Sequence, residues 1–308
     1  CNNGGGEGSI SAPIYHNGNC YQYNTPSNQV CSGSVGFGLR ICPCLLLPSP
    51  PPPPPPLFLT SLIEYATQPK FYASDPADND YFGVSVSLYG DTALIGARGD
   101  DDNSQSSSGS VYVFTRPSTD GTFTEQSKLH ANDPAPDDMF GQSVSLYGDT
   151  ALIGAHNDND NGKSGSGSVY VFTRPSTDGG TFTQQFKLHA NDPEAEDYFG
   201  ISVSLYGDTA LIGAFHDDDN KTNSGSVYVF TRSSSDGQFT EQSKLYASDA
   251  AAHDHVGISV SLYGDAALIG AYADDDNTTN SGSVYVFTRP SIDGPFTEQS
   301  KLHASDPE

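Results

Sequence analysis

The same sequence occurs four times along this chain, and that repetition limits the folds that it can adopt. The first copy reads FGVSVSLYGDTALIGA from Phe82, and close copies begin at Phe140, Phe199 and Val256, 57 to 59 residues apart. A fixed period of about this size indicates one supersecondary unit stacked on its neighbours. Such an array repeats a surface or a loop, whereas an enzyme site needs unlike residues that converge on one point. The repeat therefore predicts a structural or binding protein with no catalytic residue.

Each repeat predicts four short strands. In the first repeat these are, in order, Ser85–Tyr89, Thr92–Ala97, Ser110–Arg116 and Phe123–Ala131. The first alternates apolar and polar residues, and the second is apolar on both faces, so the second is predicted to lie inside a sheet. Gly90-Asp91 between them predicts a hairpin, because glycine accepts the positive φ of the tight turns. Stacked units of four antiparallel strands predict an all-β protein, a β-propeller with one blade per repeat.

Composition divides the chain into three parts. Residues 1–47 hold all five cysteines, residues 48–57 form a proline-rich linker, and residues 58–308 carry the repeats. The seven prolines from Pro50 to Pro56 have no backbone donors and a fixed φ, so they are predicted to form an extended polyproline II rod. The four repeats are expected at about 75–132, 133–191, 192–248 and 249–308.

The cysteines lie among glycine, asparagine and serine, at Cys1, Cys20, Cys31, Cys42 and Cys44. A short Cys-rich segment of this kind predicts two disulfides and one remaining thiol, with the pairing left open. A zinc site is the rival interpretation, but Cys42-Pro43-Cys44 has no second cysteine or histidine pair beside it. Lipidation of Cys1 is a further alternative. Because the chain begins with cysteine rather than methionine, we expect that a signal peptide has been removed.

The charge of the chain is strongly negative, −25 with only 13 lysines and arginines. This argues against binding to nucleic acid or to an anionic membrane, since both require clustered basic residues. No run of 18 apolar residues is present, so no membrane span is expected. Cations or basic partners are favoured instead.

The succession of motifs in each repeat resembles a known family. The motifs are F-G-x-S-V, G-D-T-A, I-G-A, an acidic loop, G-S-V-Y-V-F-T-R and K-L-H-A-x-D, and they span about residues 64–308. This pattern is similar to the FG-GAP repeat, found in the propeller of integrin α-subunits and in many secreted microbial and algal proteins. The resemblance implies a propeller of four-stranded FG-GAP blades and an extracellular adhesive or structural role, without a reaction.

The resemblance also implies calcium loops, in which alternating oxygen ligands follow strand two. The matching residues are Asp100 and Asp102 in the first repeat, Asn157, Asp158, Asn159, Asp160 and Asn161 in the second, Asp217 and Asp219 in the third, and Asp274 and Asp276 in the fourth. Only the second loop has the glycine at position six, and none has the closing acidic residue. Further acidic residues precede strand one, and both series are expected on one face of the disc. This acidic face either binds calcium or is simply solvated.

Carbohydrate is expected at two kinds of site. Asn220-Lys221-Thr222 and Asn277-Thr278-Thr279 are N-glycosylation sequons in the acidic loops. The proline run resembles the O-glycosylated, hydroxyproline-rich modules of algal and plant cell-wall proteins such as pherophorins and extensins, although it is also explained as a stiff spacer. That resemblance implies modification of Pro50, Pro51, Pro52, Pro53, Pro54, Pro55 and Pro56. The sequence thus predicts a glycoprotein.

One strand of the pattern is in excess. The fourth-strand motif occurs five times, because Glu64–Ala73 aligns with Thr122–Ala131, whereas strands one to three occur four times. A closed ring of four blades would have one strand too many. Either more repeats follow Glu308, or the spare strand pairs with a neighbouring subunit.

These observations predict an extracellular, non-catalytic glycoprotein that self-associates, as a structural or adhesive subunit of a surface fibre or matrix. Two alternatives stay open: an integrin-like receptor module that recognises a protein or glycan ligand, and the non-catalytic propeller of a larger secreted hydrolase. A receptor should expose a variable, aromatic-rich set of loops on one face. The loops here are nearly identical and polar, which favours the scaffold.

Overall fold

The computed structural model describes residues 70–175, 180–235, 237–275, 278–292 and 294–305, and the strand backbones at 14–16, 19–24 and 29–34. Contacts divide the chain into two units, Cys1–Thr67 and Gln68–Glu308. Several predicted sites lie outside the described residues, and the predictions about them stay predictions: Cys1, Cys42, Cys44, Pro50 to Pro56, Asp276 and Asn277, together with the side chain of Asn161.

The first unit contains a small antiparallel sheet that the sequence did not predict. Its strands are β1 (Ile14–His16), β2 (Asn19–Asn24) and β3 (Gln29–Ser34), hydrogen-bonded in that order. Cys20 lies on β2 and Cys31 on β3, where the register pairs them with Gly33 and Gln22 respectively. Two of the five cysteines therefore lie on neighbouring strands, but not directly opposite each other.

The second unit is built from four four-stranded antiparallel sheets, here called blades 1 to 4, each with its strands in chain order. Blade 1 consists of β4 (Ser85–Tyr89), β5 (Thr92–Ala97), β6 (Ser110–Thr115) and β7 (Thr124–Leu129); blade 2 of β8 (Ser143–Tyr147), β9 (Thr150–Ala155), β10 (Ser168–Thr173) and β11 (Thr183–Leu188); blade 3 of β12 (Ser202–Tyr206), β13 (Thr209–Ala214), β14 (Ser226–Thr231) and β15 (Thr240–Leu245); and blade 4 of β16 (Val256–Tyr263), β17 (Ala266–Ala271), β18 (Ser283–Thr288) and β19 (Thr297–Leu302). Two short 3₁₀ turns, η1 (Asp102–Ser104) and η2 (Asp160–Gly162), lie in the loops after β5 and β9. The predicted all-β fold with one four-stranded blade per repeat is confirmed.

The predicted fourth strand is longer than the observed one. It was expected to continue to Ala131, but β7 ends at Leu129. The chain leaves the sheet after Leu129, and Ala131 is instead buried in the cluster that joins blade 1 to blade 2. A register shift opposite Val113 and Phe114 also interrupts the pairing of β6 with β7, as a β-bulge does.

Three apolar clusters hold neighbouring blades together. Between blades 1 and 2, Phe140 is fully buried among Leu94, Val111 and Leu129 of the preceding blade. Phe199 and Val256 occupy the same position at the next two junctions. Burial of this apolar surface is the main term that stabilises the array, because each blade alone would expose one face.

The blades approach so closely that glycine is required at one position of the second strand. A Cβ atom added to Gly96 would lie 2.1 Å from the carbonyl oxygen of Gly141 in the next blade, and Gly154 and Gly213 are equally confined. The same carbonyl accepts a hydrogen bond from Ser85 Oγ at 2.7 Å. This contact fixes the spacing of adjacent blades.

A ladder of tyrosines runs across all four blades. The last residue of each first strand contributes one ring: Tyr89, Tyr147, Tyr206 and Tyr263. Successive ring centroids lie 5.1, 5.0 and 5.0 Å apart. The even spacing shows that one geometric step relates each blade to the next.

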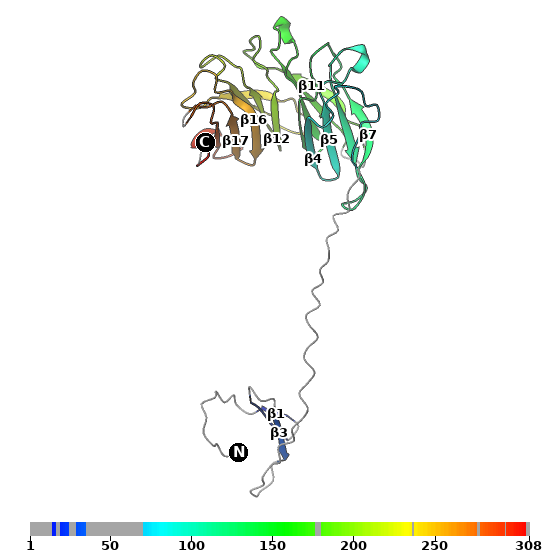
Figure 1. Ribbon diagram of the computed structural model, residues 1–308, viewed down its shortest axis with the longest axis vertical. Coiled ribbons are helices and arrows are strands. Elements are labelled where there is room, and N and C mark those ends of the chain that lie inside the picture. The colour runs from blue at the N-terminus through cyan, green and yellow to red at the C-terminus, as the bar shows by residue number, and fades with distance from the viewer. Residues whose placement is uncertain are drawn as a thin grey trace. The chain divides into compact units, whose positions relative to one another are not determined.

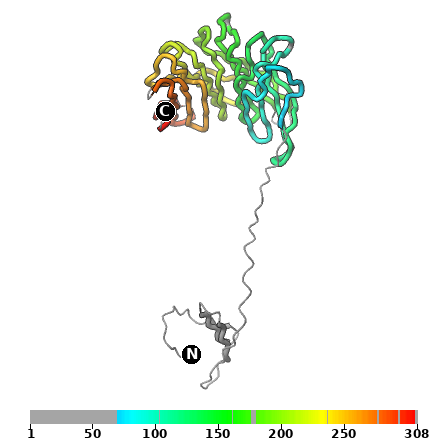
Figure 2. The backbone as a smooth tube through the Cα atoms, viewed as in Figure 1, coloured from blue at the N-terminus to red at the C-terminus, as the bar shows by residue number. Residues whose placement is uncertain are grey.

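The four blades form an open arc in Figures 1 and 2, with blade 1 (cyan) at one end and blade 4 (orange to red) at the other. The ring that the word propeller implies is therefore not closed by these four blades. The apolar residues of the two outermost faces are exposed, among them Val86 on blade 1 and Leu268 on blade 4. In the part of the chain that the structure describes, no helix has the length and apolarity needed to cross a membrane.

Candidate functional site

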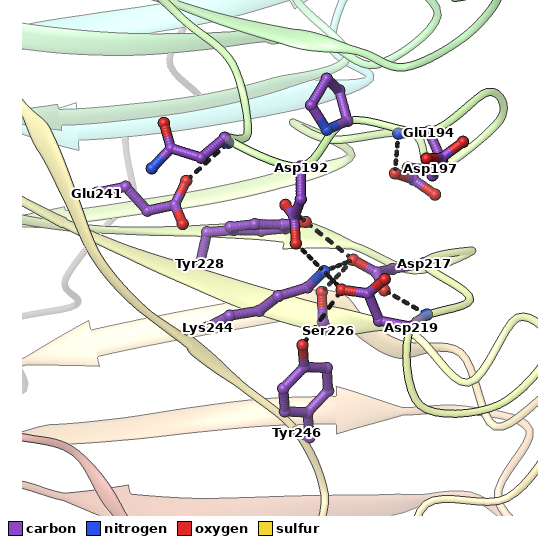
Figure 3. A network of polar contacts seen from close by, with 12 residues as sticks. Asp192, Glu194, Asp197, Asp217, Asp219, Ser226, Tyr228, Glu241, Lys244 and Tyr246 are labelled. Atoms are coloured by element: carbon purple, nitrogen blue, oxygen red, sulfur yellow. Dashed lines mark hydrogen bonds and ion pairs between the residues drawn. The ribbon is translucent and has the colours of Figure 1, made fainter.

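A lysine lies among carboxylates at the same edge of every blade. In blade 3, Lys244 Nζ is 3.0 Å from Asp192 Oδ2, 2.5 Å from Asp217 Oδ2 and 2.5 Å from Asp219 Oδ2 (Figure 3). The hydroxyl oxygen of Tyr228 is 2.9 Å from one oxygen of each of the first two aspartates. The ammonium group thus lies where several negative charges converge.

The other blades repeat this network. We call its members the leading aspartate (Asp75, Asp133, Asp192, Asp249), the loop aspartate (Asp100, Asp158, Asp217, Asp274), the strand-three tyrosine (Tyr112, Tyr170, Tyr228, Tyr285) and the strand-four lysine (Lys128, Lys187, Lys244, Lys301). The distances from lysine to the leading and loop aspartates are 2.9 and 2.6 Å in blade 1, 2.9 and 2.7 Å in blade 2, and 2.8 and 2.7 Å in blade 4. One ion-pair network therefore occurs four times.

Local structure brings these four residues together. Tyr112 and Lys128 are directly opposite each other in the register of β6 and β7, so their side chains share one face of the sheet. Lys128 Nζ lies 5.3 Å from the centre of the tyrosine ring, within the range of a cation–π contact. Asp100 comes from the loop after β5, and Asp75 from the segment that precedes strand one. The network thus links both loops to the third and fourth strands of the blade.

The pKa directions agree with an ion pair between the lysine and the leading aspartate. The Tyr112 hydroxyl and the Lys128 ammonium group hold the pKa of Asp75 below its usual value. Burial works against ionisation of Lys128, but its hydrogen bonds to Asp100 and Asp75 outweigh burial and raise the lysine pKa. Burial and the neighbouring carboxylates also raise the pKa of the tyrosine. The lysine therefore stays protonated at neutral pH and neutralises part of the acidic edge.

A second set of aspartates is buried without a lysine. Asp138 Oδ2 accepts a hydrogen bond from the backbone N–H of Ala135 at 2.7 Å, and Asp197 does the same for Glu194 at 2.7 Å. Burial raises the pKa of Asp138 and that of Asp197 to about 6, because the bond to the backbone compensates only in part. Asp80 and Asp254 make the same turn in blades 1 and 4. All four carboxylates thus fold the loop by the same hydrogen bond.

The residues predicted to bind calcium lie in or beside this lysine network. Asp100, Asp158, Asp217 and Asp274 are the loop aspartates, and Asp102, Asp160 and Asp219 lie 3.9, 3.8 and 2.5 Å from the same lysines. Asn159 Oδ1 accepts from the N–H of Gly165 at 2.8 Å, and Asn157 Nδ2 donates to the carbonyl of Asp137 at 2.7 Å. Among the described residues, no group of three or more acidic, histidine or cysteine side chains is arranged to hold a metal ion.

These residues fit an ammonium group better than calcium, because the lysine already lies between the carboxylates that calcium would need. Calcium would have to replace the lysine to reach these carboxylates. The sequence reasoning missed the lysine, although its signal is present: a basic residue recurs at one position of an otherwise acidic repeat.

Two positions beside the network vary between blades. The residue after the buried aspartate is Tyr81, Met139, Tyr198 or His255, and the residue after strand two is Arg98, His156, Phe215 or Tyr272. We call these eight residues the variable row. Its rings touch across blade boundaries, with centroid distances of 5.6 Å for His156 to Tyr198 and 5.4 Å for Phe215 to His255. The expectation of nearly identical, polar loops therefore fails at these two positions.

The arginines at the end of strand three lie beside the hairpins that join strands one and two. Each is paired with the aspartate of its own hairpin, as in the 2.8 Å contact between Arg174 Nε and Asp149 Oδ1. Arg174 Nη1 also donates to Thr92 Oγ1 of the preceding blade at 3.0 Å. These positive charges are thus already paired, so they offer little to an acidic face of another molecule.

Comparison with protein families identifies the repeating unit. A family model described as the FG-GAP repeat matches residues 65–114, 123–172, 182–230 and 239–287. The matched unit starts in a fourth strand and ends in the following third strand, and the first match begins inside the spare copy of the fourth-strand motif. The chain matches none of the curated proteins.

Proposed function

The chain belongs to the FG-GAP repeat family, and on that premise we propose that it is a non-catalytic, extracellular structural or adhesive glycoprotein, a subunit of a surface fibre or matrix. The observation that carries the proposal is the fourfold lysine network. The recurring charged residues of each blade are engaged in tying two loops to the sheet. Rigid blades of this kind suit a scaffold that transmits force or displays glycans.

The proposed glycan positions agree with this role where the structure describes them. Asn220 is exposed in the loop between β13 and β14, so a sugar there would not disturb the core. Glycans on Asn277 and on hydroxylated Pro50 to Pro56, disulfides in residues 1–47, and calcium in the acidic loops are parts of the same proposal. Calcium would take the place that the strand-four lysine now occupies between the carboxylates.

The variable row favours a second candidate function, that of an integrin-like binding module. Its aromatic and histidine side chains differ between blades while the framework that carries them is constant. A surface of that kind can recognise a protein or glycan ligand, because aromatic rings give large contact areas at low entropic cost. On this alternative the scaffold presents the row, and the ligand would contact residues such as Tyr198 and Tyr272.

Antibody labelling of the intact cells that make the protein tests the main proposal. We expect label on the outer surface, on fibres or matrix, and an intact mass above the 32.6 kDa of the polypeptide. Label that appears only after permeabilisation, together with the bare polypeptide mass, would contradict an extracellular glycoprotein. Surface label that is lost on adding a soluble ligand would favour the binding module.

A further inference from the structure

The two ends of the arc carry the two halves of a contact that the chain makes three times internally. On the front face, the side of blade 1 that no other blade of the described chain covers, Val86 is 70% exposed and Leu88 is 62% exposed. Of the corresponding residues in the later blades, Val144, Val203, Leu146, Leu205 and Leu262 are 5% to 8% exposed, and Val260 is partly buried. The front face is therefore an uncovered copy of an interior surface.

The rear face, the free side of blade 4, shows the same contrast. Leu268 is 44% exposed, whereas Leu94, Leu152 and Leu211 at the same position are fully buried. Leu268, Val284 and Leu302 line an open hollow of about 570 Å³ together with Gly282. This hollow has a known occupant at the other junctions.

That occupant is the first residue of the repeat that follows: Phe140, Phe199 or Val256. Phe140 fills the position bounded by Leu94, Val111 and Leu129, which correspond to the three residues that line the rear hollow. Phe82 is the equivalent residue of blade 1, and it is only partly buried, against its own blade. The front face thus has the side chain, and the rear face has the matching cavity.

Backbone groups at the two ends are complementary as well. Inside the array, Phe140 forms a parallel bridge with Gly109 and its N–H donates to the carbonyl of Ser108 at 2.9 Å. Gly167 and Gly225 make the same bridge with Phe199 and Val256. Gly282 corresponds to these glycines, and Phe82 corresponds to their partners. Among the described residues, neither of the two makes such a bridge.

We propose that a second copy of this chain docks on the array, with its front face against the rear face of the first copy and its Phe82 in the hollow of Leu268 and Val284. The docked copy continues the step that relates each blade to the next, and Tyr89 extends the tyrosine ladder from Tyr263. The contact is heterologous, so further copies can add in the same direction. This inference rests on the proposed structural function and names the surface by which copies assemble.

The contact requires one rearrangement. Ser74, next to Ala73, bonds to Glu125 of blade 1 through its N–H and hydroxyl, at 3.0 and 2.7 Å. Ser248 makes the same pair of bonds with Glu298 at the junction of blades 3 and 4. Residues 303–305 of the first copy and 72–74 of the second are therefore equivalent segments that compete for one place. We assign that place to residues 72–74, because Ser74 is held there by its bonds to Glu125, and residues 303–305 move aside.

The test uses the full chain and two substitutions on opposite faces. Val86→Asp places a charge on the front face, and Leu268→Asp places one on the rear face. Both side chains are exposed, so each variant should keep the melting temperature and circular dichroism of the unaltered protein. Ile292→Asp is the control, because Ile292 is 53% exposed but lies in the loop between β18 and β19.

Sedimentation velocity over a hundredfold range of concentration gives the readout. We expect the unaltered chain and the Ile292 control to form species larger than a dimer, and each end-face variant to stay monomeric. A mixture of the two variants should stop at a species of two copies, because one free front face meets one free rear face.

Other outcomes overturn the proposal. Dimers of a single variant would show a contact between like faces, and assembly of both variants like the unaltered chain would place the contact elsewhere. A full chain that stays monomeric would leave the end faces to a different occupant, such as further blades. If that chain still labels the cell surface, the docking contact fails while the extracellular function stands.

Discussion

The interior faces of the blades and the end faces of the arc are built from nearly the same residues, yet they differ in exposure. Leu205 is 5% exposed between blades 2 and 3, whereas Leu88, at the same position of the same motif, is 62% exposed. Nothing local distinguishes the two, since both lie on a strand of sequence SVSLY. In a stacked array, burial is decided by the neighbour rather than by the residue. The same substitution should therefore have very different effects at the two places.

The largest difference is expected for the phenylalanine that starts the first three repeats. Phe199→Ala removes a fully buried ring from the junction of blades 2 and 3 and should lower the free energy of unfolding by about 3–5 kcal/mol. Phe82→Ala should cost clearly less, because Phe82 packs on one blade only. Urea unfolding of the two variants, followed by circular dichroism, measures the difference. Equal losses of unfolding free energy in the two variants would show that the interior and end positions do not differ.

The lysine network should behave in the opposite way, because it lies within each blade. Lys187→Met leaves Asp133 and Asp158 unpaired and should destabilise the protein by about 3 kcal/mol, as expected when one member of a buried ion pair is removed. Lys301→Met, in the end blade, should cause a similar loss. Melting temperatures of the two variants test whether the network is independent of position in the arc.

The control for this experiment is Lys163→Met. Lys163 pairs with exposed Glu194 at 3.1 Å, and surface pairs of this kind contribute about 0–1 kcal/mol. Millimolar calcium added to Lys187→Met tests the calcium proposal at the same time. If the acidic loop accepts calcium once the lysine is gone, calcium raises the melting temperature of this variant by mass action. A shift equal in the variant and in the unaltered chain would show that lysine and calcium do not compete.

A smaller effect is expected from pH, and it arises at the interior loops. The folded state raises the pKa of Asp138 and Asp197 from 3.8 to about 6, so between these values it binds more protons than the unfolded chain. Their contribution to stability is therefore complete below pH 4 and is lost as the pH rises through 6. The double variant Asp138→Asn, Asp197→Asn should melt at a temperature less dependent on pH between 4 and 7.

Asp137→Asn, at the exposed neighbouring position, is the matched control. The leading aspartates act in the reverse direction, because their lowered pKa values make them lose their stabilising contribution as the pH falls below 3.8. A melting temperature that rises steadily from pH 4 to pH 7 would contradict the assignment to Asp138 and Asp197.

The smallest effect concerns a single hydroxyl group at the rear face. Thr92, Thr150 and Thr209 each accept a hydrogen bond from an arginine of the next blade, but blade 4 has Ala266 there. Ala266→Thr should leave the stability of the isolated chain unchanged and strengthen the docking of a second copy by about 1 kcal/mol, roughly fivefold in affinity. Sedimentation equilibrium of the two proteins measures this change. A gain in stability without a gain in association would contradict the docking geometry.

The strands were predictable because their signals are local. Alternation in Ser85–Tyr89 and the glycine of the hairpin gave β4 and the turn, and the bounds of β5 agree with the prediction. The site was only half predictable. The acidic loops could be found from their composition. The role of Lys187 could not, because it depends on the cross-strand pairing of β10 with β11, and the predicted calcium loop included neither strand. The exposure of Leu88 and Leu268 could not be predicted, since identical residues are buried elsewhere.

The tyrosine ladder has an optical consequence. The chain contains no tryptophan, so its near-ultraviolet absorption and emission come mainly from tyrosine. Four rings with centroids 5.0 to 5.1 Å apart are close enough for their electronic transitions to couple and for excitation to migrate from ring to ring. The near-ultraviolet dichroism of this protein should therefore report the order between blades without any attached dye. In an assembly of docked copies, excitation absorbed in one molecule could pass through Tyr263 into the next.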